Sequence, residues 1–150
     1  MKRNGGFTLV ELIVVIAILA TLLAMASSVY NVWRQRAYGS EAAVVMKQIL
    51  DGEIMYYLEH DEFFPEVDSE ISVWANDPPS ADSVRDIRNA INIYIPVGHH
   101  LDYTIRNDGD SCYIFINASF PLFKNGETYL WAILDKTGTW QYIGPEDLGG

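Results

Sequence analysis

The hydrophobic positions of this chain are concentrated near its N-terminus, in one uninterrupted block. No charged side chain occurs in the 22 residues from Leu12 to Trp33. At about 1.5 Å per residue, a helix of this length reaches roughly 30 Å, the thickness of the hydrocarbon layer of a bilayer. Lys2 and Arg3 precede the block, so we expect the N-terminus to stay in the cytoplasm and the rest to lie outside.

Hydrophobic residues continue at helical spacing after this block. Intervals of four, three, four and seven residues put five of them on one stripe of an α-helix, namely Tyr38, Ala42, Val45, Ile49 and Tyr56. Three further residues widen the stripe: Met46, Leu50 and Tyr57. The charged residues of the segment are expected mostly off it: Arg36, Glu41, Lys47, Asp51, Glu53 and Glu59. The pattern predicts one long helix with an apolar stripe.

Two features predict where this helix bends and where it ends. Gly39-Ser40 predicts a bend, because glycine and serine together weaken a helix. Pro65 follows an acidic and aromatic run, which predicts an end near His60. A single helix from Phe7 to Glu59 would be roughly 80 Å long at 1.5 Å per residue.

The last third of the chain changes from helical spacing to a period of two. Residues 66–97 have the composition of a linking region, in which Ser80 is expected to cap a short helix through Ala90. Strand-like alternation then appears in four segments, at residues 101–106, 111–118, 129–134 and 139–143. We expect three or four antiparallel strands packed on the long helix, which is an α+β fold.

Three interpretations of the N-terminal segment compete. The basic start, the apolar stretch and Ala24-Met25-Ala26 fit a secretory signal peptide that is cut after Ala26. An uncleaved membrane helix is the second interpretation. The third is a prepilin leader that is cut between Gly6 and Phe7, so that the apolar helix stays on the mature chain.

Glu11 separates these interpretations. A carboxylate inside an apolar segment costs about 3 kcal/mol or more in a bilayer, and neither a signal peptide nor a simple membrane helix needs one. Thr8-Leu9-Val10-Glu11 has the spacing of a capping box, in which Thr8 caps the helix and Glu11 reaches back. A carboxylate in the first turn also suits the positive end of the helix dipole. These local effects lower the cost but do not require a position in the membrane.

The stretch from Gly5 to Leu19, GGFTLVELIVVIAIL, resembles the N-terminal motif of type IV pilins and type II secretion pseudopilins. The resemblance implies cleavage after Gly6 by a prepilin peptidase and methylation of the new amine of Phe7. It also implies that Glu11 pairs with the N-terminal ammonium of a neighbouring subunit, with Thr8 beside it. Such a partner offsets the cost of a buried carboxylate only in the correct register. Many family members carry a proline where this chain has Ser28, and Ser27-Ser28 can loosen the helix by bonding back to the preceding turn.

The resemblance also implies a division of the chain and a set of partners. Residues 1–6 would be the removed leader, residues 7–33 the membrane and filament-core helix, and residues 34–150 the rest of the helix with a globular head. The expected partners are identical subunits, the prepilin peptidase, an inner-membrane assembly platform and the membrane itself. The chain would start in the inner membrane and end in an extracellular pilus. A periplasmic pseudopilus of type II secretion and a soluble secreted domain remain the alternatives.

Composition and motifs argue against catalysis and nucleic-acid binding. Twenty acidic and ten basic residues give a net charge of −10, which repels nucleic acid. The sequence has no phosphate-binding glycine loop, no H-E-x-x-H and no C-x-x-C. We expect His99-His100 in a solvated loop, residues 107–110 in a hairpin turn, and Cys112 in a buried strand position. No cofactor, metal or enzymatic activity is therefore predicted.

Overall fold

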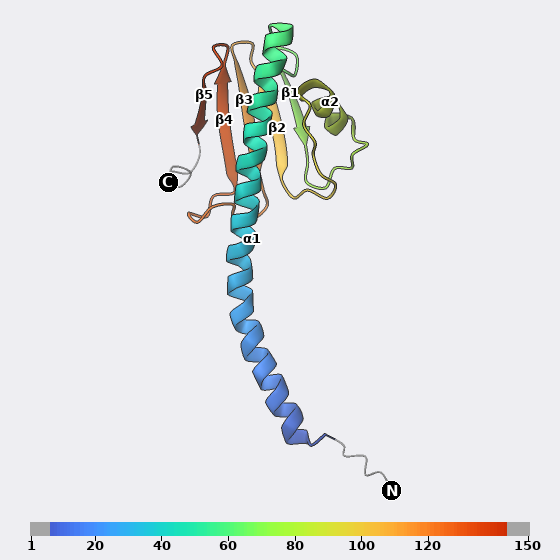
Figure 1. Cartoon of the computed structure of the whole chain (residues 1–150), viewed down its shortest axis with the longest axis vertical. Helices are drawn as coiled ribbons and strands as arrows, with labels where there is room; N and C mark the ends of the chain where they lie inside the picture. Colours follow the sequence, from blue (N-terminus) through green and yellow to red (C-terminus); the bar gives the residue numbers. More distant parts are fainter. Residues whose placement is uncertain (1–6, 144–150) are drawn as a thin grey trace. The chain divides into compact units, whose positions relative to one another are not determined.

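The computed structural model describes residues 7–143, apart from the side chain of Ser28. Its elements, in chain order, are α1 (Leu9–His60), β1 (Ser69–Val73), α2 (Asp82–Ile91), β2 (Asp102–Asn107), β3 (Ser111–Asn117), β4 (Tyr129–Asp135) and β5 (Trp140–Ile143) (Figure 1). The chain divides into two compact units, and the boundary between them falls within the sequence of α1. The N-terminal unit extends to Arg34, and the head starts at Gln35.

The head is one antiparallel sheet packed on the C-terminal part of α1. The five strands lie in the order β1-β2-β3-β4-β5 (Figure 1). Ile105 of β2 is opposite Ile114 of β3, and Ile114 is opposite Ala132 of β4. This is the predicted α+β fold, with one strand more than expected. Residues 69–73 were assigned to a linking region, but they form β1 and pair with β2.

The core lies between the inner stripe of α1 and one face of the sheet. Ala42, Met46, Ile49 and Leu50 of α1 are all buried, as their helical spacing predicts. The sheet contributes the alternate residues of its strands, listed here: Ile105, Cys112, Ile114, Ile116, Leu130 and Leu134. The predicted burial of Cys112 is confirmed. α1 ends at His60, where Pro65 predicted an end.

Gly39 has a packing role that its sequence context did not predict. The residue lies inside α1, and a Cβ atom placed on it would stand 2.5 Å from the backbone oxygen of Leu122. The side chain of Gln35, one turn earlier, donates a hydrogen bond to the backbone oxygen of Phe123. Gly39 therefore allows the β3–β4 loop to reach the helix backbone.

The short helix α2 begins one residue later than predicted. Its N-cap is Ala81, which has no side chain able to accept a capping hydrogen bond, so the prediction of a Ser80 cap was wrong. Packing instead of capping accounts for this helix, because Val84, Ile87 and Ile91 are buried along one face. Asn92 ends it in the left-handed conformation, with a φ of 55°.

A substitution at Gly39 tests its packing role. Glycine to alanine normally stabilises a helix interior by about 1 kcal/mol. We expect Gly39→Ala to destabilise the head by about 1–3 kcal/mol, because the new methyl group overlaps the Leu122 carbonyl. Urea unfolding of the full chain in detergent measures the change. The matched control is Ser40→Ala at the next, exposed position, and a stabilising effect of Gly39→Ala would contradict the assignment.

Candidate functional site

A reciprocal set of hydrogen bonds closes the N-terminus of α1. The backbone nitrogen of Thr8 donates to Oε2 of Glu11 at 2.8 Å, and the Thr8 hydroxyl donates to the same oxygen at 2.7 Å. In return, the backbone nitrogen of Glu11 donates to Oγ1 of Thr8 at 3.2 Å. This is a capping box, and the prediction made from the spacing of Thr8 and Glu11 is confirmed.

The capping box leaves the Glu11 carboxylate only partly engaged. Its Oε2 accepts two hydrogen bonds from Thr8, whereas no bond from residues 7–143 reaches its Oε1. Phe7, directly before this pair, is 83% exposed. Gly6, the other residue of the predicted cleavage site, lies outside the described residues. The N-terminus of α1 thus presents an oriented carboxylate with one free oxygen.

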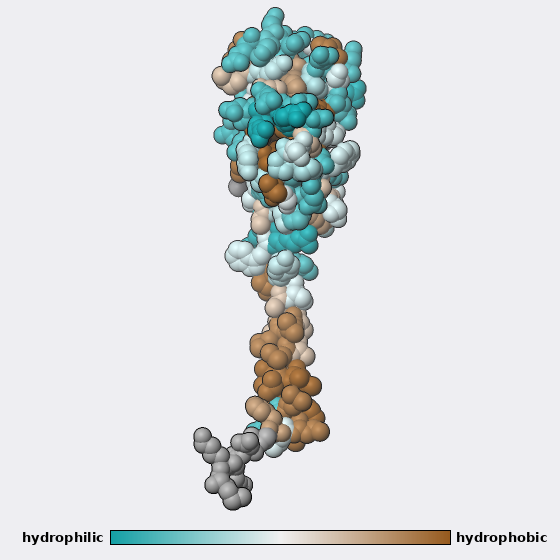
Figure 2. Space-filling view, turned by 90° about the vertical axis from the view of Figure 1, so that its right-hand side faces the viewer, coloured by the Kyte–Doolittle hydropathy of each residue, from teal (hydrophilic) through white to brown (hydrophobic). Residues whose placement is uncertain are grey.

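The rest of the N-terminal unit exposes apolar side chains on every side. Large hydrophobic residues from Leu9 to Trp33 are each at least 44% exposed within the chain. Figure 2 shows these apolar side chains gathered along the unit. In the described part of the chain, α1 is the one helix that is long and apolar enough to cross a membrane. A helix that is apolar all round needs an apolar environment, either lipid or other protein.

Two hydroxyl side chains of this unit bond to the backbone of their own helix. The hydroxyl of Thr21 donates to the backbone oxygen of Ile18 at 2.8 Å, and that of Ser27 donates to the oxygen of Ala24 at 3.1 Å. The bond of Ser27 back to the preceding turn was predicted and is present. These two hydroxyls have partners of their own, whereas Glu11 has a carboxylate oxygen that no bond from residues 7–143 reaches.

Comparison with known proteins agrees with these observations. Residues 1–27 match the family model described as "Prokaryotic N-terminal methylation motif". The N-terminal segment of the chain is therefore similar to that of prokaryotic proteins that carry this motif. Two fimbrial proteins of Neisseria meningitidis, from serogroups B and A, are each 41% identical to this chain over 58 residues. The matched region is 39% of this chain, and it spans about a third, 34%, of either relative. No solved structure matches the chain.

The head contains a buried carboxyl group that the sequence pattern did not predict. Glu53 was expected off the apolar stripe, but its side chain is fully buried. Its Oε2 accepts a hydrogen bond from the backbone nitrogen of Phe64 at 3.0 Å, and its Oε1 has no partner within the described residues. Burial raises the pKa of Glu53 to about 8. A signal was present, because Glu53 fills the gap in the stripe between Ile49 and Tyr56.

Asn107, at the end of β2, bonds to the same loop after α1 that Glu53 contacts. It is fully buried, and its side-chain nitrogen donates to the backbone oxygens of Phe63 and Pro65, each at 2.8 Å. Its Oδ1 accepts from the backbone nitrogen of Gly109 at 2.8 Å. Two buried polar side chains therefore fasten the loop that follows α1 to the end of β2. This arrangement belongs to the architecture of the head.

The histidine pair does not lie in a fully solvated loop. His99 is buried, and its Nδ1 donates to the backbone oxygen of Leu101 at 2.8 Å, whereas His100 is exposed. The ring of His99 lies 5.5 Å from that of Tyr103, and neither His99 Nε2 nor the Tyr103 hydroxyl has a partner within residues 7–143. Among these residues, no three His, Cys, Asp or Glu side chains gather as a metal site would require.

The raised pKa of Glu53 predicts a specific pH dependence of stability. Between its ordinary pKa of 4.5 and about 8, Glu53 keeps its proton in the folded chain and loses it in the unfolded chain. The free energy of unfolding should therefore fall as the pH rises through this window, by about 1.4 kcal/mol per pH unit for one proton. Glu53→Gln should remove this contribution, because an amide side chain does not titrate in this range. Its oxygen can still accept the hydrogen bond from the backbone nitrogen of Phe64.

The measurement is urea unfolding of the full chain in detergent at several pH values between 5 and 8. The control is Glu59→Gln, at an exposed position of the same helix. The account predicts that only Glu53→Gln flattens the pH profile relative to the unmodified chain. Parallel profiles for the unmodified chain and Glu53→Gln would contradict it.

Proposed function

We propose that this chain is a structural subunit of a type IV pilus-like filament. It would be made as an inner-membrane precursor, cut after Gly6 by a prepilin peptidase, and methylated on the amine of Phe7. A membrane assembly platform would then move it into a helical polymer of identical subunits. The single observation that best supports this proposal is the N-terminal unit, which exposes its apolar side chains and places one oriented carboxylate at its start.

The apolar helix explains why the subunit would have two environments. Fully burying one Leu, Ile or Val side chain stabilises by about 1.5–3 kcal/mol relative to water, so the unit cannot remain in water. Lipid and a bundle of identical helices both satisfy this requirement. Because lipid tails are as apolar as leucine, the hydrophobic effect does not favour the bundle over the membrane. Polar contacts and packing must then decide when and in which register the subunit leaves the lipid.

Glu11 is the group that can make this difference. In lipid its carboxylate is costly, and in the filament the ammonium of Phe7 from a neighbouring subunit would neutralise it. Thr8 would serve as a positioning residue, because its two hydrogen bonds fix Oε2 and leave Oε1 free for that ammonium. Only one axial register of the two helices would bring these groups together.

The names of the matched relatives and the matched motif support the pilus form of this proposal. Both matched relatives are named as fimbrial proteins, which supports a surface fibre before a secretion pseudopilus. The match to the methylation motif over residues 1–27 supports a leader cut near Gly6 instead of a signal peptide cut after Ala26. The acidic head, in a chain with a net charge of −10, would face solvent on the outside of the filament.

Variants at Glu11 and Thr8 test the register. Glu11→Ala should leave leader processing intact and reduce the yield of sheared filaments about tenfold or more, since the neighbouring ammonium loses its partner. Thr8→Val should also lower the yield, and Thr8→Ser should keep it, because serine retains the hydroxyl. Immunoblots of the sheared and membrane fractions measure both steps.

Thr21→Val is the matched control, because the Thr21 hydroxyl bonds only to its own helix. It should leave both processing and filament yield close to those of the unmodified chain. A normal filament yield from Glu11→Ala would refute the proposed register.

A further inference from the structure

The end of the head at which α1 finishes is strongly acidic. The segment after His60 lies beside the end of β2 there, because Asn107 donates to the backbone oxygens of Phe63 and Pro65. The β2–β3 turn follows directly, and its Asp110 accepts from Lys136 of the β4–β5 turn. Six exposed carboxylates lie on these connections: Asp61, Glu62, Glu66, Asp68, Asp108 and Asp110. We call this set the distal acidic patch. Lys136 forms an ion pair with Asp110 at 2.9 Å, and the charge of Arg106 acts on Asp108. Six carboxylates against these two cations leave the patch with a surplus of negative charge.

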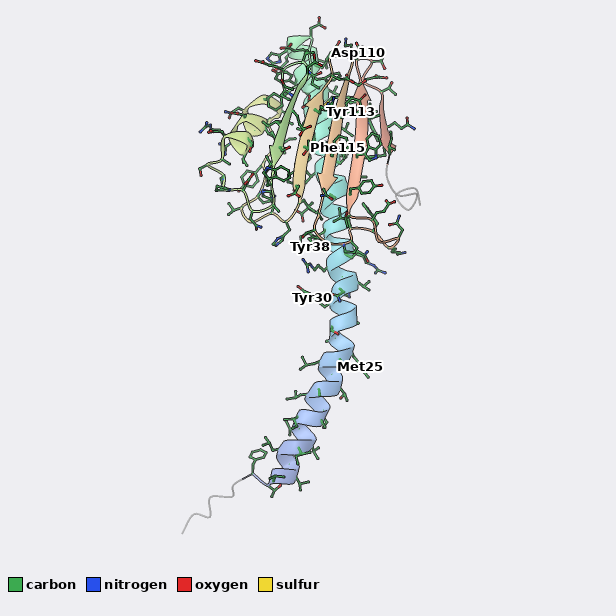
Figure 3. All side chains as sticks on the ribbon, turned by 180° about the vertical axis from the view of Figure 1, so that it is seen from behind. Met25, Tyr30, Tyr38, Asp110, Tyr113 and Phe115 are labelled. Carbon is green, nitrogen blue, oxygen red and sulfur yellow. The ribbon has the colours of Figure 1, made fainter. Side chains whose placement is uncertain are left out.

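The opposite end of the head exposes two positive charges. Arg36 follows Gln35, whose side chain holds the backbone oxygen of Phe123, and Lys124 follows Phe123. Both charged side chains are exposed, and we call them the proximal basic pair. Figure 3 shows Tyr38, from the start of this part of α1, and Asp110 at opposite ends of the head.

The carboxylates near the proximal end are less available than the two basic side chains. Glu41, Asp102 and Glu127 are all half-buried. Asp102 accepts a short hydrogen bond of 2.6 Å from the backbone nitrogen of Ala75. The proximal basic pair therefore gives this end of the head exposed positive charge, in a chain with twice as many acidic as basic residues.

Complementary charges at two ends of one body have a consequence for assembly. A contact between different surfaces of identical subunits is heterologous, and it produces an open helical polymer when its rotation does not close a ring. A net charge of −10 makes heads repel one another unless their opposite charges are brought together. Charge complementarity also fixes the orientation and register of a contact.

We propose that, in the filament, the proximal basic pair of one head contacts the distal acidic patch of another copy of this chain. This inference rests on the proposed function and adds the head surfaces through which subunits stack. Arg36 and Lys124 of the upper subunit lie against the carboxylates after α1 in the lower one. The contact involves only residues of the head, so variants at these residues leave Glu11 and Thr8 unchanged.

Charge reversal tests this contact in the full chain. Arg36→Glu with Lys124→Glu should lower the yield of sheared filaments about tenfold or more, because attraction becomes repulsion. Glu62→Lys with Glu66→Lys should lower it similarly. The chain with all four substitutions has the original net charge and reversed ends, and it should recover filament yield to within about threefold of the unmodified chain.

The control for net charge is Lys47→Glu with Arg88→Glu, two exposed positions outside both patches. It makes the same change in charge as the proximal reversal and should leave the yield unchanged. The melting temperature of each full-length variant in detergent shows whether the head is folded. Recovery in the fourfold variant also shows that both reversed surfaces are tolerated by the fold.

Two results would overturn the inference while leaving the proposed function intact. One is normal filament yield from both double variants. The other is a proximal reversal that the distal reversal does not rescue, as expected if Arg36 and Lys124 bind lipid phosphates. Absence of the unmodified chain from sheared filaments would instead contradict the proposed function, and this inference with it.

Discussion

Keeping the N-terminal unit of α1 out of water is the constraint on which the rest of the structure depends. Its large side chains are exposed within the chain, and the hydroxyls of Thr21 and Ser27 bond to the helix itself. Such a surface is stable only in lipid or among other helices. Because both environments are equally apolar, apolar burial does not distinguish them. The proposed role of the Glu11 carboxylate follows from this, because its cost differs between lipid and a site with a cationic partner. The capping box gives that carboxylate a defined orientation within its own chain.

The head has a different requirement, because it buries one face of α1 and exposes polar residues to solvent. The inner stripe of α1 is sealed by the sheet, and Gly39 lets a loop backbone touch the helix. At the far end, Glu53 and Asn107 hold the loop after α1 through buried hydrogen bonds. A neutral Glu53 fits this environment, because an ionised carboxylate without a cation is disfavoured there. The buried network fixes the connection on which the distal acidic patch is displayed.

The sequence was informative where a pattern repeats and uninformative where a single contact decides. Helical spacing predicted the inner stripe, the period of two predicted β2 to β5, and the spacing of Thr8 and Glu11 predicted the cap. The strand β1 was not predicted, because its five residues, SEISV, are too short for a clear alternation. Glu53 and His99 were placed outside the core because residue type suggested exposure, whereas tertiary contacts buried both. The close approach of Leu122 to Gly39 joins segments that are far apart in the chain. The local sequence around either residue therefore does not predict it.

Mass spectrometry of the N-terminus, on sheared surface and membrane fractions of the native host, tests the central claim most directly. The account predicts a mature chain that begins at methylated Phe7 and is abundant in the sheared fraction. Such a chain would retain the apolar unit and the capping box, and its location would show that the unit is covered by other subunits outside the cell. A soluble chain that begins at Ser27 would contradict the account, because the apolar unit, Glu11 and Thr8 would all have been discarded.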